Sequence, residues 1–206
     1  MKICFVILHY LTYKDTDECI ESILNNQDYE NKEIIVVDNG SNNGSYELLE
    51  EKYSDNPSIH LIKSDINLGF AKGNNLGFSF AKKELNADFI ILINNDTLVN
   101  QKDFCKQIII KYKQYNYSVL GPDIHTLDNV HQNPYFRDGL SLKQCKRIII
   151  KQYIHIFLTY LGFDELISKK INHDSIKKIS GDVLDVPLHG ACLIFSKNYI
   201  NEFEGL

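Results

Sequence analysis

The sequence predicts an α/β domain, a three-layer sandwich with a mainly parallel central sheet. Short, nearly uninterrupted apolar runs recur through the first 121 residues, and segments with helical spacing of apolar residues separate them. Strands that are buried on both faces have such continuous apolar runs, because helices cover the sheet on either side. Polar residues follow directly after the runs, at the edge where sheets of this kind bind ligands.

Each element of this half has a local signal. Asp15 or Thr16 is suited to cap the first helix, and Ser45 to cap the second. The stretch "NLGFAKGNN", rich in Gly and Asn, is predicted to be a loop. The expected strands are residues 3–8, 33–38, 60–63, 89–93 and 119–121. The expected helices are residues 16–24, 45–53, 78–85 and 102–115.

The second half has weaker patterns. Residues 122–137 are expected to form an irregular loop, and residues 146–170 a long helix. Strands are predicted at 183–186 and 191–196, with a helix beginning near Lys197.

Composition excludes several classes of protein. The 206 residues carry a net charge of −5, which argues against an electrostatically driven nucleic-acid binder. Five scattered cysteines lack the spacing of a metal site and are predicted to be reduced thiols. The N-terminal apolar run is too short for a signal peptide, and no stretch reaches the roughly 20 apolar residues of a membrane span. These features predict a cytoplasmic protein.

Asp38 and Asp96 are the carboxylates at the ends of two predicted strands. Asp38 can accept hydrogen bonds from a nucleobase N–H or from ribose hydroxyls, although Asp also favours such turns without any function. Asp96, between Asn95 and Thr97, can hold Mg²⁺ or Mn²⁺ together with substrate phosphates. Its structural alternative is a polar strand end that leads into a turn.

Other polar groups belong to the same predicted edge. His9 and Tyr10 follow the first strand. In "NLGFAKGNN", Gly69 and Gly73 permit close backbone approach and Lys72 can meet a phosphate, but ordinary turn chemistry explains this loop equally well.

The strings "VVDNGS", "NLGFAKGNN" and "LINNDT", in this order, resemble the family 2 glycosyltransferases with the GT-A fold, most of all the bacterial rhamnosyltransferase-like subset. The resemblance runs from Ile3 to Gly121 and returns at "HGACLIF", residues 189–195. The family often has Asp at the position of Asn94.

The resemblance implies an inverting transfer of a sugar from a UDP- or dTDP-sugar to a glycan or lipid-linked acceptor, in bacterial surface polysaccharide synthesis. It implies that Asp38 contacts the base or ribose and that Asp96 coordinates a divalent metal, Mn²⁺ or Mg²⁺. The residues expected to bind the donor are His9, Tyr10, Asp38, Asn67, Lys72, Asn75, Asn94 and Asn95.

An inverting transfer also needs a general base. In the family this base lies in an acidic motif beyond the GA-containing strand, and the sequence stops soon after that strand at Leu206. We therefore expect residues 1–121 to be a nucleotide-sugar-binding half and residues 122–206 an incomplete acceptor-side region. The catalytic residue is not identified, and His189, Asp185 and Glu204 are weak candidates for the base.

Two alternatives remain open at this stage. A non-catalytic nucleotide-sugar-binding module fits the missing base, whereas a sugar nucleotidyltransferase would need a glycine-rich basic loop after the first strand. The apolar segment 146–163 is either a core or subunit-contact helix or a helix at the inner face of the membrane, near a lipid-linked acceptor. The sequence does not predict the oligomeric state.

Overall fold

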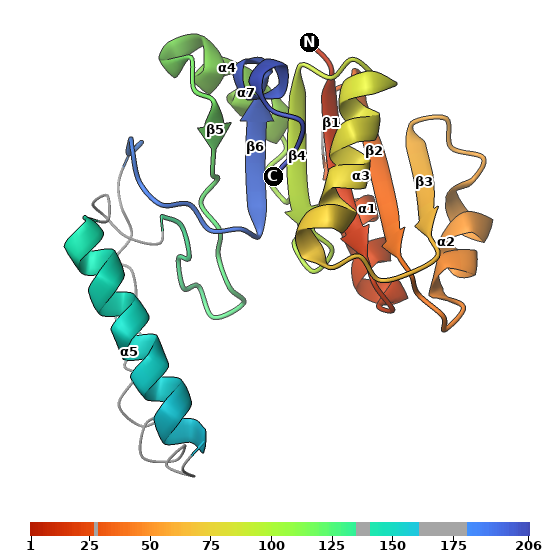
Figure 1. Ribbon diagram of the computed structural model, residues 1–206. Coiled ribbons are helices and arrows are strands. Elements are labelled where there is room, and N and C mark those ends of the chain that lie inside the picture. The colour runs from red at the N-terminus through yellow and green to blue at the C-terminus, as the bar shows by residue number, and fades with distance from the viewer. Residues whose placement is uncertain (27–28, 135–140, 161–180) are drawn as a thin grey trace. The chain divides into compact units, whose positions relative to one another are not determined.

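The computed structural model describes residues 1–26, 29–134, 141–160 and 181–206, and it contains a six-stranded sheet (Figure 1). Its strand order is β3-β2-β1-β4-β6-β5. The strands are β1 (Ile3–His9), β2 (Lys32–Asn39), β3 (Ile59–Ser64), β4 (Phe89–Asn94), β5 (Val119–Leu120) and β6 (Cys192–Ser196). β1 is parallel to β2 and β4, β2 is parallel to β3, and β6 is antiparallel to both of its neighbours, β4 and β5.

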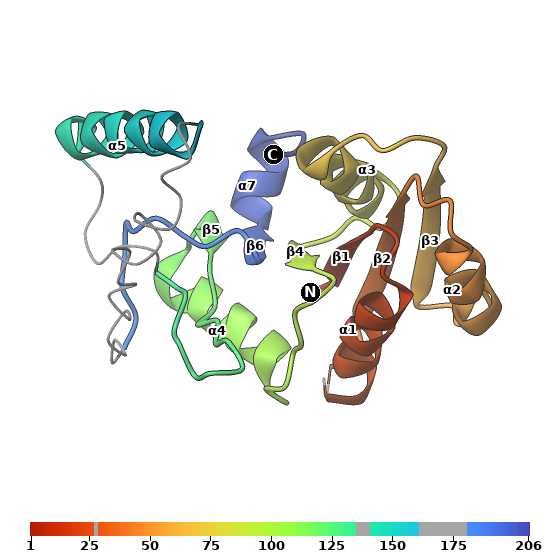
Figure 2. The ribbon, with the colours of Figure 1, turned by 90° about the horizontal axis from the view of Figure 1, so that it is seen from below.

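Helices cover both faces of the sheet, as the apolar strands predict. The helices are α1 (Tyr13–Asn26), α2 (Ser45–Tyr53), α3 (Phe70–Lys83), α4 (Phe104–Tyr115) and α7 (Lys197–Glu202). Figure 2 shows α1, α2 and α4 on one face and α3 and α7 on the other. Phe78 packs against Phe195 under α3, and Phe5 packs against Phe104 under α4. The predicted three-layer sandwich with a mainly parallel sheet is confirmed.

Helix α3 begins earlier than predicted. It starts at Phe70, so the second part of "NLGFAKGNN" is helical rather than a loop. Gly73 and Gly77 lie against the sheet, where a Cβ would meet Leu8 Cδ1 and Val6 Cγ1 respectively. These glycines are therefore required for close helix–sheet packing, and they do not mark a turn.

The strand predicted at residues 183–186 is wrong, because the structure has no strand there. Asp185 has a φ of 54°, which is a left-handed conformation that an extended strand excludes. The strand predicted at 191–196 and the helix from Lys197 are confirmed as β6 and α7.

The chain divides into two units, Met1–Pro122 with Gly190–Leu206, and Asp123–His189. Residues 190–206 belong with the first unit because β6 pairs with both β4 and β5. In the second unit, α5 (Leu142–Tyr160) contains most of the predicted long helix, and residues 161–170 of that prediction lie outside the described residues. The predicted irregular loop contains a backbone bridge between His125 and His131, and its residues 135–137 also lie outside the described residues.

Candidate functional site

The strand register brings the predicted site residues to one edge of the sheet. His9, the last residue of β1, lies opposite Asp38 of β2, and Leu8 lies opposite Asn94 of β4. Since all three strands are parallel, their carboxyl ends share one edge, and Asp38 and Asn94 flank the end of β1. Asp96 follows Asn94 by two residues.

His9 is buried beneath this edge with both ring nitrogens occupied. Nδ1 lies 2.7 Å from Thr16 Oγ1, and Nε2 lies 2.8 Å from Ser45 Oγ. The Thr16 hydroxyl donates its hydrogen to Thr12 O at 3.1 Å. Its oxygen therefore acts as the acceptor toward His9, and His9 carries its proton on Nδ1. Burial lowers the pKa of His9, and the opposing effect of Asp38 is smaller. His9 therefore cannot contact a ligand directly and can affect one only through the residues that it holds in place.

Asp38 is also buried in this structure. Its two carboxylate oxygens accept the Ser41 N–H at 3.3 and 3.2 Å. The turn passes through Gly40, whose φ is 79° and whose Cβ, if present, would lie 2.5 Å from Ile66 C. Only glycine fits this position, so the turn is packed onto the loop that follows β3. Contact between Asp38 and a ligand requires a local rearrangement of this turn.

Asn39 ties that loop to β2, and the sequence interpretation did not identify it. Its side chain is buried, Oδ1 accepts the Leu68 N–H at 2.9 Å, and Nδ2 donates to Asn67 Oδ1 at 3.1 Å. Asn67 Oδ1 also accepts the Gly69 N–H at 2.8 Å. The sequence feature that could have identified Asn39 is its position directly after Asp38, at the end of a predicted strand.

The turn after β4 is anchored to α1 by Asn95. Its Nδ2 donates to Thr12 Oγ1 at 2.7 Å and to Thr16 Oγ1 at 3.1 Å. Asn94 is half-buried, and its O accepts the Thr97 N–H at 3.1 Å, which closes the turn. Asp96 is exposed, and within the described part of the chain no group hydrogen-bonds to its carboxylate.

The remaining predicted donor residues lie just after β1 and in α3. Tyr10 is 43% exposed just after β1, and Lys72 is exposed in the first turn of α3. Asn75 Oδ1 accepts the Leu206 N–H at 2.8 Å, so part of its amide is already occupied. Asn74, its neighbour, is buried and donates to Phe70 O at 2.9 Å.

The candidate bases differ in their surroundings. His189 and Asp185 both belong to the second unit, where the backbone N–H of His189 donates to Asn133 Oδ1 at 3.1 Å and Asp185 is exposed. Glu204 pairs with Lys82 at 2.6 Å, which lowers the pKa of its carboxyl.

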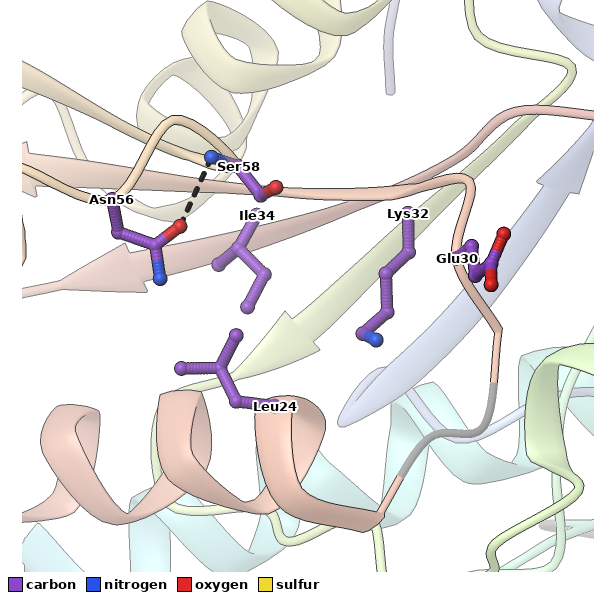
Figure 3. Close-up of a pocket in the computed structure, with 6 residues that line it drawn as sticks. All are labelled: Leu24, Glu30, Lys32, Ile34, Asn56 and Ser58. Carbon is purple, nitrogen blue, oxygen red and sulfur yellow. Dashed lines mark hydrogen bonds between the residues drawn. The ribbon is translucent and has the colours of Figure 1, made fainter.

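A small cavity lies at the opposite edge of the sheet, around the amino end of β2 (Figure 3). Its volume is about 90 Å³, whereas pockets for ligands typically have roughly 300–1,000 Å³. It is lined by Leu24, Glu30, Lys32, Ile34, Asn56 and Ser58. This cavity is too small for a nucleotide.

The fold is an α/β sandwich whose parallel strands end in polar residues at one edge, and sequence comparison specifies the family. The sequence model of the family described as "Glycosyl transferase family 2" matches residues 4–167. The chain therefore belongs to glycosyl transferase family 2.

Two relatives are named as glycosyltransferases. The chain is 32% identical over 101 residues to the low-salt glycan biosynthesis hexosyltransferase Agl10 of Haloferax volcanii, a match that covers 49% of this chain and 31% of Agl10. It is 28% identical over 134 residues to the glycosyltransferase GlyG of Streptococcus pneumoniae serotype 4, covering 65% of this chain and 42% of GlyG. The chain thus spans less than half the length of these relatives.

Solved structures share the fold at low sequence identity. Residues 1–349 of S. aureus TarS superpose with a TM-score of 0.53 and 21% identity, over 62% of this chain and 37% of that one. The mannosyltransferase PcManGT from Pyrobaculum calidifontis, in complex with GDP-Man and Mn²⁺, superposes with a TM-score of 0.52 and 16% identity, over 61% and 36% of the two chains. These likenesses support the GT-A fold.

Proposed function

We propose that the protein transfers a sugar from a nucleoside diphosphate donor, a UDP- or dTDP-sugar, to an acceptor hydroxyl with inversion at the anomeric carbon. The observation that carries this proposal is the position of Asp38 and Asp96 at one edge of the sheet, on either side of β1, in a family 2 chain. Asp38 accepts hydrogen bonds from the base or ribose, and Asp96 binds Mn²⁺ or Mg²⁺.

The carboxylate of Asp96 fits a hard divalent cation. It is exposed and accepts no hydrogen bond from the described residues, while Asn95 holds its turn on α1. Such a cation typically takes one or two carboxylates and completes its coordination with substrate phosphates and water. When bound, the metal would neutralise charge on the diphosphate leaving group.

The other polar groups would position the donor. Tyr10 and Lys72 are exposed, so they can contact the base and a phosphate respectively. Asn94 and Asn95 lie in the Asp96 turn and would contact the ribose or phosphates. Asn67 and Asn75 keep their Nδ2 groups for the donor. His9 acts by holding Thr16 and Ser45 through its two ring nitrogens.

The transfer itself is a displacement at carbon. The acceptor oxygen bonds to the anomeric carbon while the bond from that carbon to the diphosphate oxygen breaks, and a base takes the acceptor proton. His189 and Asp185 are the proposed candidates for this base. Removal of a general base typically lowers the rate by about 10²–10⁴-fold.

Calorimetric binding of UDP-, dTDP- and GDP-sugars, with and without Mn²⁺, tests the donor site. Asp96→Asn should abolish the metal-dependent part of the binding, and Asp38→Asn should weaken binding both with and without metal. Asp55→Asn is the matched control, because Asp55 is an exposed carboxylate just before β3, at the opposite edge. Asp96→Asn protein that binds a donor in Mn²⁺ as tightly as the wild type contradicts the metal role.

Release of nucleoside diphosphate distinguishes an enzyme from a non-catalytic binding module, which is the second candidate function. A non-catalytic module would bind the donor but would release no nucleoside diphosphate when metal and acceptor are present. The family match gives no support to a sugar nucleotidyltransferase.

We further propose a glycan or lipid-linked acceptor, with peripheral contact of α5 at the inner face of a membrane. α5 carries Lys143, Lys146, Arg147 and Lys151 and no acidic residue, although the chain as a whole has a net charge of −5. Several of its apolar side chains are exposed, including Ile150 at 59% and Tyr153 at 70%. A basic helix with exposed Ile and Tyr side chains is suited to an anionic interface. In the described residues, no helix is long and apolar enough to cross a membrane.

Sedimentation with vesicles tests this contact. The wild type should bind phosphatidylglycerol vesicles and not phosphatidylcholine vesicles, and Ile150→Asp with Tyr153→Asp should reduce the binding. Leu98→Asp with Leu127→Asp is the control, because both leucines are exposed and lie outside α5. Equal binding by all these proteins would contradict a membrane role for α5.

A further inference from the structure

We propose that Asp123, His125 and His131 form a binding site for a transition-metal ion of the zinc type. The donor atoms of these three side chains all lie within 4.8 Å of one another. The three residues belong to the second unit, whereas Asp96 belongs to the first, so this site goes beyond the proposed sugar transfer.

A short hairpin brings the two histidines together. His125 and His131 face each other in an antiparallel bridge, and the Gln132 N–H donates to Ile124 O at 2.8 Å. At the tip, the Thr126 N–H donates to Val130 O at 3.0 Å. Residues directly opposite in an antiparallel pair place their side chains on the same face. The two imidazole rings accordingly lie with their centroids 4.2 Å apart.

The Asp123 carboxylate contacts both rings. Its Oδ2 is 3.0 Å from His125 Nε2, and its Oδ1 is 2.9 Å from His131 Nδ1. Zinc binds nitrogen and carboxylate oxygen at about 2.0–2.2 Å, so tetrahedral geometry separates two ligand atoms by roughly 3.3–3.6 Å. The carboxylate–imidazole distances therefore need to lengthen by only a few tenths of an ångström to admit an ion.

The donor set selects the class of metal. Imidazole nitrogen suits Zn²⁺, Ni²⁺ and Cu²⁺, whereas Mg²⁺ and Ca²⁺ prefer sites built from oxygen alone. The side chains of His125 and Asp123 are 45% and 49% exposed, and that of His131 is 14% exposed. An ion could therefore enter from solvent and keep one position for water. The competing explanation is a pair of surface His–Asp hydrogen bonds without an ion, which a binding experiment separates from a metal site.

Titration of the intact, metal-free chain with Zn²⁺ in a calorimeter is the test. We expect one equivalent to bind with a Kd of about 10 μM or tighter. His125→Ala and His131→Ala should each weaken this binding by at least roughly 10–100-fold. Loss of a residue that only supports a metal ligand already has an effect of this size, and loss of the ligand itself should have a larger one. Asp123→Asn should weaken it as well.

Two controls locate the ion. His155→Ala removes an exposed histidine of α5 in the same unit, and Asp96→Asn removes the proposed donor-site ligand; neither should change Zn²⁺ binding. Co²⁺ should give visible d–d absorption without sulfur-to-cobalt charge transfer, which excludes the five cysteines as ligands. Circular dichroism checks folding of each variant, and His131→Gln replaces His131→Ala if the latter does not fold.

The proposal is overturned by any of three results. The first is a wild type that binds no Zn²⁺ at this affinity, and the second is binding that survives loss of both His125 and His131. The third is binding that falls equally in His155→Ala, because the ion would then be held by surface histidines in general.

Discussion

His9 Nε2 lies 3.8 Å from Asp38 Oδ1, and both side chains are completely buried. The same imidazole contacts Thr16 Oγ1 through Nδ1, and Thr16 Oγ1 accepts a hydrogen bond from Asn95. A chain of polar contacts therefore connects the Asp38 end of β2 with the turn that carries Asp96. This chain explains why polar groups are tolerated beneath the edge of an apolar sheet, since each of them has a partner.

The first prediction concerns pH. Burial lowers the pKa of His9 below its ordinary value of 6.5, and Asp38 opposes that shift only in part. Well above pH 6.5 His9 is neutral in both the folded and the unfolded chain. Below pH 6.5 the unfolded chain binds a proton that the folded chain resists, so the free energy of unfolding falls as the pH decreases toward the folded pKa. This contribution is at most about 1.4 kcal/mol per pH unit.

His9→Gln should remove that contribution. Urea unfolding between pH 7 and pH 5 should show a shallower loss of stability in the variant than in the wild type. The variant will also be less stable at pH 7, because the contacts to Thr16 and Ser45 change, so the test is the slope and not the absolute value. Identical slopes would show that His9 is not the group responsible.

A second prediction concerns Asn39. Asn39→Ala removes the acceptor of the Leu68 N–H and the donor to Asn67, and the resulting unmade hydrogen bonds should cost about 1–3 kcal/mol in the free energy of unfolding. Donor affinity should fall too, since the loop after β3 loses its anchor. Asn42→Ala, at an exposed position in the turn after β2, is the control and should change stability by less than about 0.5 kcal/mol. Equal stability of the two variants would refute the anchoring role.

A third prediction concerns the packing of α3. In Gly77→Ala the new Cβ would overlap Val6 Cγ1 and lie 3.0 Å from Val37 Cγ2. Both valines are buried and stiff, so overpacking of about 1–3 kcal/mol should exceed the gain of about 1 kcal/mol in helix propensity. Thermal unfolding should show a lower Tm for Gly77→Ala. Gly190→Ala, where a Cβ meets nothing within 4 Å, should leave the Tm nearly unchanged.

A fourth prediction concerns the thiols. Burial raises the pKa of Cys4, Cys105 and Cys192 to about 12, and it raises the pKa of Cys19 as well. At pH 8 a thiol with this pKa has a thiolate fraction of about 10⁻⁴, against about a quarter for a free cysteine. Iodoacetamide should therefore modify Cys145, which is half-exposed, well before the other four cysteines. Rapid alkylation that persists in Cys145→Ser would contradict this order.

The sequence by itself determined the alternation of strands and helices as far as β5, and with it the sheet edge that carries Asp38 and Asp96. Apolar runs and helical periodicity are local signals, and each of them depends only on which faces of one element are buried. The motif strings likewise identified the family that the comparison confirms.

Only the tertiary structure decided the features that depend on distant contacts. Gly73 belongs to the stretch predicted as a loop but lies in α3, and the sheet beneath the helix leaves no room for a Cβ at Gly73 or at Gly77. Asn39 anchors the loop after β3 only because that loop lies against the end of β2 in the folded chain. His125 and His131 are six residues apart in sequence and meet only because the chain turns back between them. Local pattern cannot show such contacts, since it carries no information about which segments become neighbours.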